Sequence, residues 1–333
     1  MHWRRKSAIQ RVCARLPIGK EQFYFQLQRR FGQLSRPHDP SWLLTEAVRL
    51  SSVLEKAGPP IEGSRVMEIG TGWRIDMPIG FFLCGAKSVV TVDLYRHLKP
   101  DLAMDTIRFL RENRETSRQI FSSRWECSAF QARLQRLEQV TSFSELQEVA
   151  KIEYRAPSDA ANPGLPDGSI DLQVSYTVFE HIPGAVLLSI LKAANRLLAP
   201  KGVTLHHVDL SDHFAHDDRS ISLINFLRFS DEQWRKLGGN QFAYHNRLRI
   251  EDYKRIYAEA GHQILQWQEC VDTRSLHELE NGFPLHEQYR QQPFQMLSTT
   301  ILHVLSAPPV KKLAKRSVVY GIERDSSHRL SLH

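Results

Sequence analysis

The chain is poor in cysteine. Its only cysteines in 333 residues are Cys13, Cys84, Cys127 and Cys270, and no two of them form a C-x-x-C pair. Zinc sites built on cysteine and disulfide-stapled secreted domains both need closely paired or regularly spaced cysteines. The sequence therefore indicates reduced thiols in a cytoplasmic protein, and it argues against a cysteine-based metal site.

Long apolar runs are also missing. No stretch approaches the ~18 apolar residues of a membrane-spanning helix, and the basic N-terminus is followed by Arg11, Arg15 and Lys20 instead of the apolar centre of a secretory signal. We therefore expect a cytoplasmic protein without a transmembrane segment. Peripheral contact with a membrane surface stays open.

Acidic residues are outnumbered by basic ones. The chain has 37 Asp and Glu against 44 Lys and Arg, a formal net charge of +7. Such an excess is compatible with nucleic acid, an anionic lipid or an anionic small substrate. Much of it lies near the two ends, at 4–6 and 311–316, where charges are usually solvated. The charge therefore indicates no particular partner.

A glycine turn follows a short apolar segment. The sequence RVMEIGTG occupies 65–72, and VVTVD, which ends in Asp93, occupies 89–93. Parallel sheets bind nucleotide-like cofactors beyond the carboxyl ends of their strands, where glycines allow close approach and an acid about 20 residues further on binds ribose hydroxyls. A dinucleotide fingerprint needs a third glycine at position 75, where this chain has isoleucine. It also normally lacks an acid two residues before its first glycine, where this chain has Glu68. The pattern therefore favours a cofactor other than NAD.

Glu68, Gly70, Gly72 and Asp93 together resemble the first motif and the following acidic motif of class I S-adenosylmethionine-dependent methyltransferases. Four further segments resemble family motifs in the family's order: SDA at 158–160, LPDGSIDLQVS at 165–175, VFEHI at 178–182 and LLAPKG at 197–202. The resemblance covers about 62–307, and the ordered motifs make it specific. Trp73 departs from the family, which often has a third glycine there.

The resemblance implies an α/β fold, a Rossmann-like doubly wound sheet of seven strands whose last strand is antiparallel. We expect a helical N-terminal extension over 1–60, a methyltransferase domain over 61–308 and a basic, flexible tail over 309–333. The domain is expected to carry a helical insertion at 95–148 and a substrate-side insertion at 209–249. The extension is interpreted either as a lid or membrane-surface helix, or as helices that pack on the core.

Local patterns predict the elements of this fold. Strands are expected over 65–69, 89–93, 152–154, 170–176, 203–208, 263–269 and 299–305. Helices are expected over 41–56, 101–113, 124–149, 185–198 and 250–260.

The resemblance implies S-adenosylmethionine as the cofactor. It assigns ribose binding to Asp93 and the adenine amino group to Asp159, and it gives Glu68 the turn and the amino end of the methionine moiety. Asp159 and Glu68 can equally be ordinary turn acids. The full set of predicted cofactor-binding residues is Glu68, Gly70, Thr71, Gly72, Asp93, Leu94, Asp159, Ala160 and Ser175.

Histidine and aspartate are dense between 205 and 218. Methyl transfer to a hydroxyl needs an oriented acceptor and removal of its proton. Our leading hypothesis makes His213 the general base, with Asp209 or Asp212 fixing its tautomer. His181, in the VFEHI motif, is the alternative base.

Two other interpretations of this segment stay open. Histidine and aspartate can together hold a divalent cation, as in certain catechol-type methyltransferases. The segment does not resemble their ligand motif, so we predict no metal site. In a purely structural interpretation, Asp212 caps a helix that begins near His213.

The predicted function is O-methylation of a small-molecule or glycan-type acceptor by in-line transfer. The alternatives are an N-methyltransferase, a lipid or nucleic-acid methyltransferase, and a non-catalytic cofactor-binding scaffold. Nucleic acid is disfavoured because 175–178 lacks the Asn or Asp, Pro-Pro and aromatic pattern of nucleic-acid amino-methyltransferases. Aromatic residues and arginines at 221–257 can form a pocket that binds an anionic acceptor, or a satellite core. The sequence gives no oligomeric state.

Overall fold

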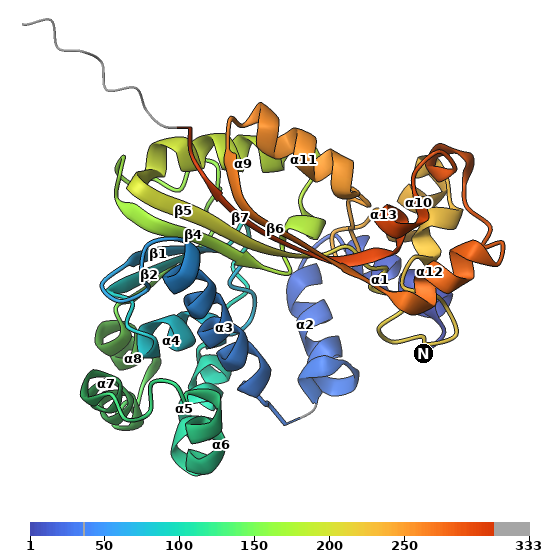
Figure 1. Ribbon diagram of the computed structural model, residues 1–333. Helices are drawn as coiled ribbons and strands as arrows, with labels where there is room; N and C mark the ends of the chain where they lie inside the picture. Colours follow the sequence, from blue (N-terminus) through green and yellow to red (C-terminus); the bar gives the residue numbers. More distant parts are fainter. Residues whose placement is uncertain (36, 310–333) are drawn as a thin grey trace, which may run out of the picture.

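The protein is built around one seven-stranded sheet, as a computed structural model of residues 1–35 and 37–309 shows (Figure 1). The strand order is β3-β2-β1-β4-β5-β7-β6. The first five strands pair in parallel, and β7 runs antiparallel to both β5 and β6. This confirms the predicted fold class. The strands are β1 Arg65–Ile69, β2 Ser88–Val92, β3 Ile152–Arg155, β4 Ile170–Tyr176, β5 Leu198–Asp209, β6 Gln263–Val271 and β7 Thr299–Ala307.

Helices cover both faces of this sheet and fill the insertions. The α-helices are α1 Trp3–Ala14, α2 Lys20–Phe31, α3 Ser41–Ala57, α4 Asp76–Leu83, α5 Pro100–Glu112, α6 Arg114–Ile120, α7 Ser128–Glu138, α8 Phe143–Ala150, α9 Gly184–Leu197, α10 Asp231–Gly238, α11 Ile250–Glu259, α12 Thr273–Glu280 and α13 Phe294–Ser298. The 3-10 turns are η1 Gln33–Ser35, η2 Phe179–His181, η3 Asn225–Arg228 and η4 Glu287–Tyr289. No helix within residues 1–35 and 37–309 combines the length and apolar composition needed to cross a membrane. Of the predicted tail, only residue 309 lies within the described residues.

Two element predictions were wrong. The single helix expected over 124–149 is two helices, α7 and α8. The side chain of Ser142 accepts a hydrogen bond from the backbone N–H of Glu145, and the Glu145 carboxylate accepts one from Thr141. These bonds start a new helix and end the old one, because capping groups compete with a continuous helix. Strand β5 also begins at Leu198, five residues before the predicted start, and passes an irregularity in its pairing with β4.

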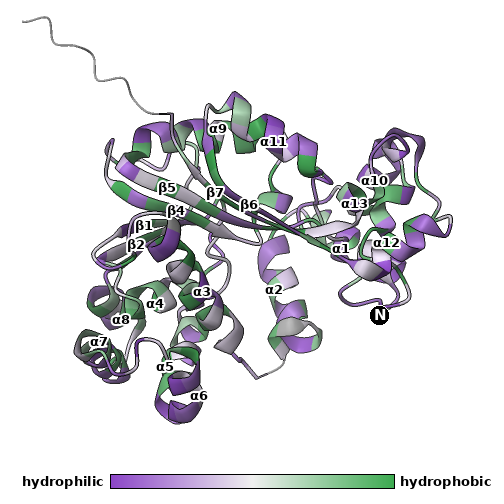
Figure 2. Ribbon diagram, viewed as in Figure 1, coloured by the Kyte–Doolittle hydropathy of each residue, from purple (hydrophilic) through white to green (hydrophobic). Residues whose placement is uncertain are grey.

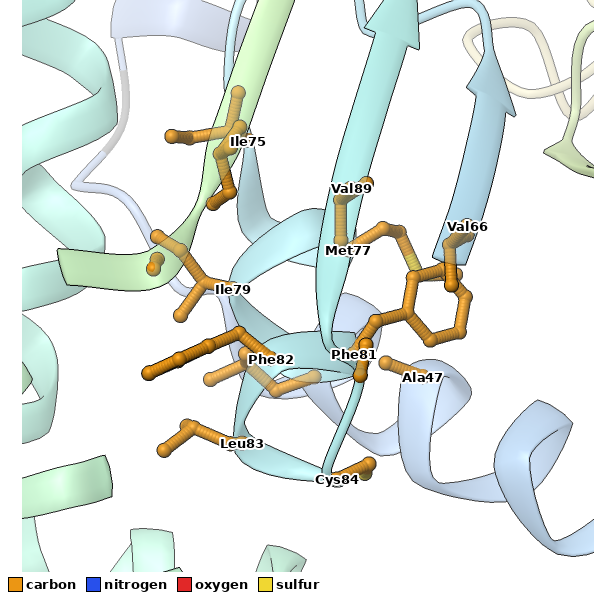
Figure 3. Packing of buried hydrophobic residues seen from close by; sticks show 14 of the residues in the cluster. Ala47, Val66, Ile75, Met77, Ile79, Phe81, Phe82, Leu83, Cys84 and Val89 are labelled. Atoms are coloured by element: carbon orange, nitrogen blue, oxygen red, sulfur yellow. The ribbon is translucent and has the colours of Figure 1, made fainter. Parts of the chain in front are cut away.

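The sheet has a separate apolar core on each face. One core lies under α3, α4, α5, α7 and α8, and the other lies under α9 and α11 (Figure 1). Figure 3 shows Phe81 of α4 between Ala47 of α3 and Val66 of β1. Polar residues dominate the outer helices α6 and α7 in Figure 2, as expected for helices that bury one side.

A third apolar cluster forms what we call the satellite lobe, beside the sheet (Figure 1). It combines α1 with parts of 214–243 and 279–297, and its buried members are Trp3, Phe214, Ile224, Phe226, Leu227, Trp234, Ala243, Leu279, Tyr289 and Leu297. The Trp3 ring lies 5.7 Å from that of Phe214. The first helix therefore packs on the insertion after β5. The second insertion, between β6 and β7, completes this lobe and was not predicted.

Arg249 joins the satellite lobe to the sheet. Its side chain is buried, with the residue 2% exposed, and its guanidinium donates to the carbonyls of Leu210 and Leu297 at 2.8 Å each and to that of Thr299. Arg247 donates to the carbonyls of Phe226 and Phe229. The guanidinium groups of Arg247 and Arg249, which the sequence suggested as binders of an anionic acceptor, therefore donate to backbone carbonyls within the protein.

Replacing Arg249 with methionine is expected to lower the free energy of unfolding by about 3 kcal/mol or more, because several buried carbonyls lose their donor and each costs roughly 1–3 kcal/mol. Urea unfolding followed by circular dichroism measures this. Arg255→Met is the matched control, since Arg255 is exposed on α11 and bonds only Asp252 among the described residues; its expected effect is within about 0.5 kcal/mol. Equal effects of the two substitutions would contradict the anchoring role.

Candidate functional site

The glycine turn after β1 contacts the segment that follows β4. Gly70 and Gly72 have φ values of +84° and +68°, which L side chains rarely adopt. A Cβ on Gly70 would stand 2.4 Å from Cγ2 of Val178, whereas a Cβ on Gly72 would meet no atom within 4 Å. The fold thus packs the turn against the VFEHI motif at Gly70 and leaves open space at Gly72.

Asp93 places a carboxylate beside this turn, directly after β2. It is 7% exposed, its Oδ1 lies 3.4 Å from the backbone N–H of Gly72, and its Oδ2 accepts a hydrogen bond of 3.1 Å from the Tyr154 hydroxyl. Burial raises the pKa of Asp93 to about 6, although these donors act in the opposite direction. The carboxylate is therefore mostly ionised at pH 7 and is protonated under mildly acidic conditions.

Glu68 supports the turn from inside the protein. Its buried carboxylate accepts a hydrogen bond from the hydroxyl of Thr91, which is also hydrogen-bonded to the hydroxyl of Thr71. Burial raises the pKa of Glu68 to about 8. The chain from Glu68 through Thr91 to Thr71 fixes the turn, and this role accounts for the acid two residues before the first glycine.

The loop after β3 lies next to Asp93. The backbone N–H of Ser158 donates to the Asp93 carbonyl at 2.8 Å, and the exposed Asp159 accepts a hydrogen bond of 2.8 Å from Ala161 N–H. Ala160 is buried. The structure therefore brings the predicted adenine-binding segment to the predicted ribose-binding acid.

Two other predicted cofactor residues differ in position. Leu94 follows Asp93 and is 61% exposed, so its apolar side chain is available to a ligand. Ser175 is fully buried, and its hydroxyl is hydrogen-bonded to Nδ1 of His206 at 2.7 Å. The Ser175 side chain therefore points to the neighbouring strand instead of the turn.

Helix α2 spans the region between the glycine turn and the satellite lobe. Phe25 of α2 packs edge-on against Trp73 with ring centroids 5.7 Å apart, and Tyr24 stacks on Phe242 at 4.1 Å. Sequence reasoning did not single out these contacts. The signal was present in Trp73, the departure from the family's glycine pattern, whose large ring supports α2.

The predicted base and one of its predicted partners meet beyond β5. Nε2 of His213 lies 3.4 Å from Oδ2 of Asp209 and 4.0 Å from Oε1 of Glu180, and Asp209 also lies 3.6 Å from Nε2 of His216. Burial opposes ionisation of Asp209, but its contacts with His213 and Ser211 outweigh burial and lower its pKa well below the usual range. The structure thus sets an ionised carboxylate beside the His213 ring.

Asp212 is turned away from His213. Its buried carboxylate accepts hydrogen bonds from Phe214 N–H at 2.9 Å and from Asn225 Nδ2 at 3.0 Å. Burial raises its pKa to about 6. Asp212 caps a turn over 213–217 at the edge of the satellite lobe. The structure shows no α-helix in these described residues, where the structural interpretation expected one to begin near His213. Of the two predicted partners, the structure brings only Asp209 to His213.

His181 and the unpredicted His245 complete this group. The ring centroids of His181 and His245 lie 4.9 Å and 4.0 Å from that of His213. Nδ1–H of His181 donates to the Tyr244 carbonyl at 2.8 Å. His245 precedes α11, in a stretch that was interpreted from the sequence as a pocket wall or satellite core. Only the fact that it is a histidine could have identified it as a functional residue.

The two histidines inside β5 face opposite sides of the sheet, as strand alternation predicted. His206 is fully buried, stacks on Phe179 and bonds Ser175. His207 lies 3.2 Å from His303, measured between their Nδ1 atoms, and burial lowers its pKa to about 3. Both are therefore neutral polar groups within the sheet region at physiological pH.

Comparisons with known proteins give one family match. A family model described as a methyltransferase domain matches residues 44–266, more than half of the chain. No curated protein matches the chain significantly.

Several solved structures resemble the chain at low identity. A putative S-adenosylmethionine-dependent methyltransferase from Listeria monocytogenes has 15% identity and a TM-score of 0.41, over 78% of this chain and 98% of that one. A putative methyltransferase from Bacillus halodurans has 13% identity and a TM-score of 0.41, over 80% and 98%. A geranyl diphosphate methyltransferase solved with S-adenosylmethionine has 12% identity and a TM-score of 0.43, over 89% and 94%. Similarity this low carries no information about the substrate.

Proposed function

This chain belongs to the methyltransferase domain family, and on that premise we propose that it methylates a hydroxyl of a small-molecule or glycan-type acceptor, with His213 and Asp209 removing the proton. Family membership confirms the enzyme class and the S-adenosylmethionine cofactor predicted from the motifs. The acceptor and the catalytic residues belong to the proposal.

One observation carries the proposal. The Gly70 turn touches Val178, and Val178 directly precedes η2, which ends at His181 beside His213. The predicted cofactor cradle and the histidine group are therefore neighbours across a single packing contact. An acceptor held between them would have a base on one side and a methyl donor on the other, the arrangement that in-line transfer requires.

The residues around the turn fit the cofactor. The open space at Gly72 admits a ligand close to the backbone, and the Asp93 carboxylate next to it can accept hydrogen bonds from two ribose hydroxyls. Leu94, the residue after Asp93, is 61% exposed and offers an apolar surface to the cofactor. When bound, S-adenosylmethionine supplies a methyl group already activated by its positively charged sulfur.

The chain's own task is then to orient the acceptor and take its proton. The imidazole of His213 can take a proton from a hydroxyl, and the Asp209 carboxylate at 3.4 Å stabilises the imidazolium that forms. Helix α2 links the turn to the satellite lobe through Phe25 and Tyr24, a position suited to excluding water above the site.

The direct test is release of S-adenosylhomocysteine from purified full-length protein offered S-adenosylmethionine with panels of monosaccharides, phenols and matched amines. Methyl ethers found by mass spectrometry support the proposal. Products confined to amines would replace it with N-methylation. Tight cofactor binding without turnover on any panel, with lipid and RNA panels included, would favour the scaffold alternative.

Affinity for S-adenosylmethionine is expected to fall as pH drops below about 6. The pKa of Asp93 is raised to about 6, so the carboxylate gains a proton as pH falls through that value and loses part of its capacity to accept ribose hydrogen bonds. Calorimetric titrations at pH 7.5 and 5.0 should differ by about tenfold, since a hydrogen bond to a charged group contributes roughly 1.5–3 kcal/mol. Asp93→Asn should bind weakly at both pH values. An equal decline in the Asp93→Asn variant would assign the pH dependence to another group.

A further inference from the structure

The three histidines beyond β4 and β5 have the composition and spacing of a metal site. His181 in η2, His213 after β5 and His245 before α11 each offer a ring nitrogen, and these nitrogens all lie within 4.8 Å of one another. Three nitrogens bound to one zinc-sized ion are about 3.4 Å apart. The separations between these nitrogens therefore need to shorten by at most about 1.4 Å for the group to hold an ion.

The nitrogens of this group are poorly used by the protein. His245 is 8% exposed, and neither of its ring nitrogens makes a hydrogen bond of ordinary geometry with any described residue. Buried imidazole nitrogens are rarely left in this state. The Tyr244 carbonyl accepts from Nδ1–H of His181, which fixes the tautomer and leaves Nε2 with a free lone pair. Backbone carbonyls hold metal-binding histidines in the same way.

Two carboxylates flank the same group. Glu180 is 2% exposed, and within the described part of the chain neither of its oxygens makes a hydrogen bond of ordinary geometry. Its Oε1 lies 4.0 Å from Nε2 of His213, and Asp209 lies 3.4 Å from the same atom. A cavity of about 10 Å³, with room for roughly one water-sized particle, is lined in part by Glu180, Asp209 and His245. A buried acid without a donor is costly unless a cation or a proton satisfies it.

We propose that His181, His213 and His245 bind a first-row transition-metal dication of the zinc class, with Glu180 and Asp209 balancing its charge. Imidazole nitrogens suit zinc and its neighbours, whereas magnesium and calcium prefer oxygen ligands. The site could not be predicted from residue spacing, because its ligands come from three separate segments that only the fold brings together.

The cation would have a defined use in methyl transfer. Three protein ligands leave a coordination position for an acceptor oxygen, and a bound dication lowers the pKa of such a hydroxyl. In the metal-loaded protein His213 would be a ligand, and the cation would lower the pKa of the acceptor hydroxyl so that its proton passes to the carboxylate of Asp209 or Glu180. The acceptor oxygen would then take the methyl group, and the cofactor would leave as S-adenosylhomocysteine. This use rests on the function proposed above, whereas metal binding itself does not.

The test uses tag-free, full-length protein stripped of metal with a chelator and titrated with Co²⁺, whose visible absorption reports nitrogen coordination. We expect one equivalent of Co²⁺ to bind with a visible spectrum, to be displaced by Zn²⁺ and to be unaffected by millimolar Mg²⁺. Absence of saturable Co²⁺ and Zn²⁺ binding by natively folded protein would overturn the proposal.

Three variants locate the site. His181→Ala, at an exposed position, and His245→Ala should each weaken Co²⁺ binding by at least the roughly 10–100-fold that loss of an outer-shell partner alone costs. His277→Ala removes an exposed histidine of α12 and should leave the titration unchanged. Wild-type affinity in the folded His181→Ala variant would place the cation elsewhere and overturn the assignment, even where His245→Ala fails to fold.

The same samples are titrated with S-adenosylmethionine. Cofactor binding without Co²⁺ binding would defeat the metal proposal and leave the methyltransferase function intact. Co²⁺ binding without cofactor binding would support the metal proposal and contradict the methyltransferase function.

Discussion

Replacing His213 with alanine is expected to lower the turnover number by about 10²–10⁴-fold, the usual contribution of a positioned acid or base. The affinity for S-adenosylmethionine should stay nearly unchanged, because His213 lies on the far side of the contact between Gly70 and Val178 from the cofactor turn. Steady-state release of S-adenosylhomocysteine, measured with the best acceptor of the panels, gives the first quantity. Calorimetry gives the second.

Two aspartates provide the comparison for this experiment. Asp209→Asn removes the charge 3.4 Å from the imidazole and should also slow turnover strongly. Asp212→Asn alters a carboxylate of the same type three residues away that bonds Phe214 and Asn225, so its effect should appear in stability instead of turnover. A loss below about tenfold in His213→Ala would remove His213 from the reaction. A much larger loss in His181→Ala would make His181 the base.

The fold could be predicted because its information is local. Short apolar strands, glycine turns and ordered motifs follow from strand periodicity and backbone conformation, and the seven expected strands form one sheet with β7 antiparallel. The same locality explains the cofactor edge. Gly70, Gly72 and Asp93 follow directly after two consecutive strands, and parallel pairing of β1 with β2 is enough to bring them together.

The histidine group was only partly predictable because it depends on long-range packing. His181 was visible as a member of the VFEHI motif and His213 as part of the segment dense in histidine and aspartate. His245 comes close to them only because Arg249 and the satellite lobe fix the path of the chain before α11. Sequence spacing could not rank Asp209 above Asp212 either, since both lie within four residues of His213. Asn225 of the insertion donates a hydrogen bond to Asp212 and so keeps that carboxylate away from His213, which leaves Asp209 as the partner.

Replacing Gly70 with alanine is expected to lower the free energy of unfolding by about 2–6 kcal/mol and to weaken cofactor binding by more than about tenfold. Two costs add. The φ of +84° strains any L residue by roughly 1–3 kcal/mol, and the new methyl would overlap the Val178 side chain, which adds about 1–3 kcal/mol. Relief of that overlap would also displace Val178 and the η2 turn that follows it, so turnover should fall together with stability.

Gly72→Ala and the double variant Gly70→Ala/Val178→Ala separate these costs. Gly72 has a similar φ but open space around it, so its substitution should cost only about 1–2 kcal/mol of stability. Its methyl projects into the space assigned to the cofactor, and the affinity for S-adenosylmethionine should therefore fall by more than the stability loss suggests. In the double variant the overlap with Val178 is removed while the backbone strain stays. The stability losses of the single variants Gly70→Ala and Val178→Ala should therefore sum to more than the loss measured for the double variant. Additive losses would show that the contact between the glycine turn and the VFEHI motif is not what couples cofactor binding to the catalytic residues.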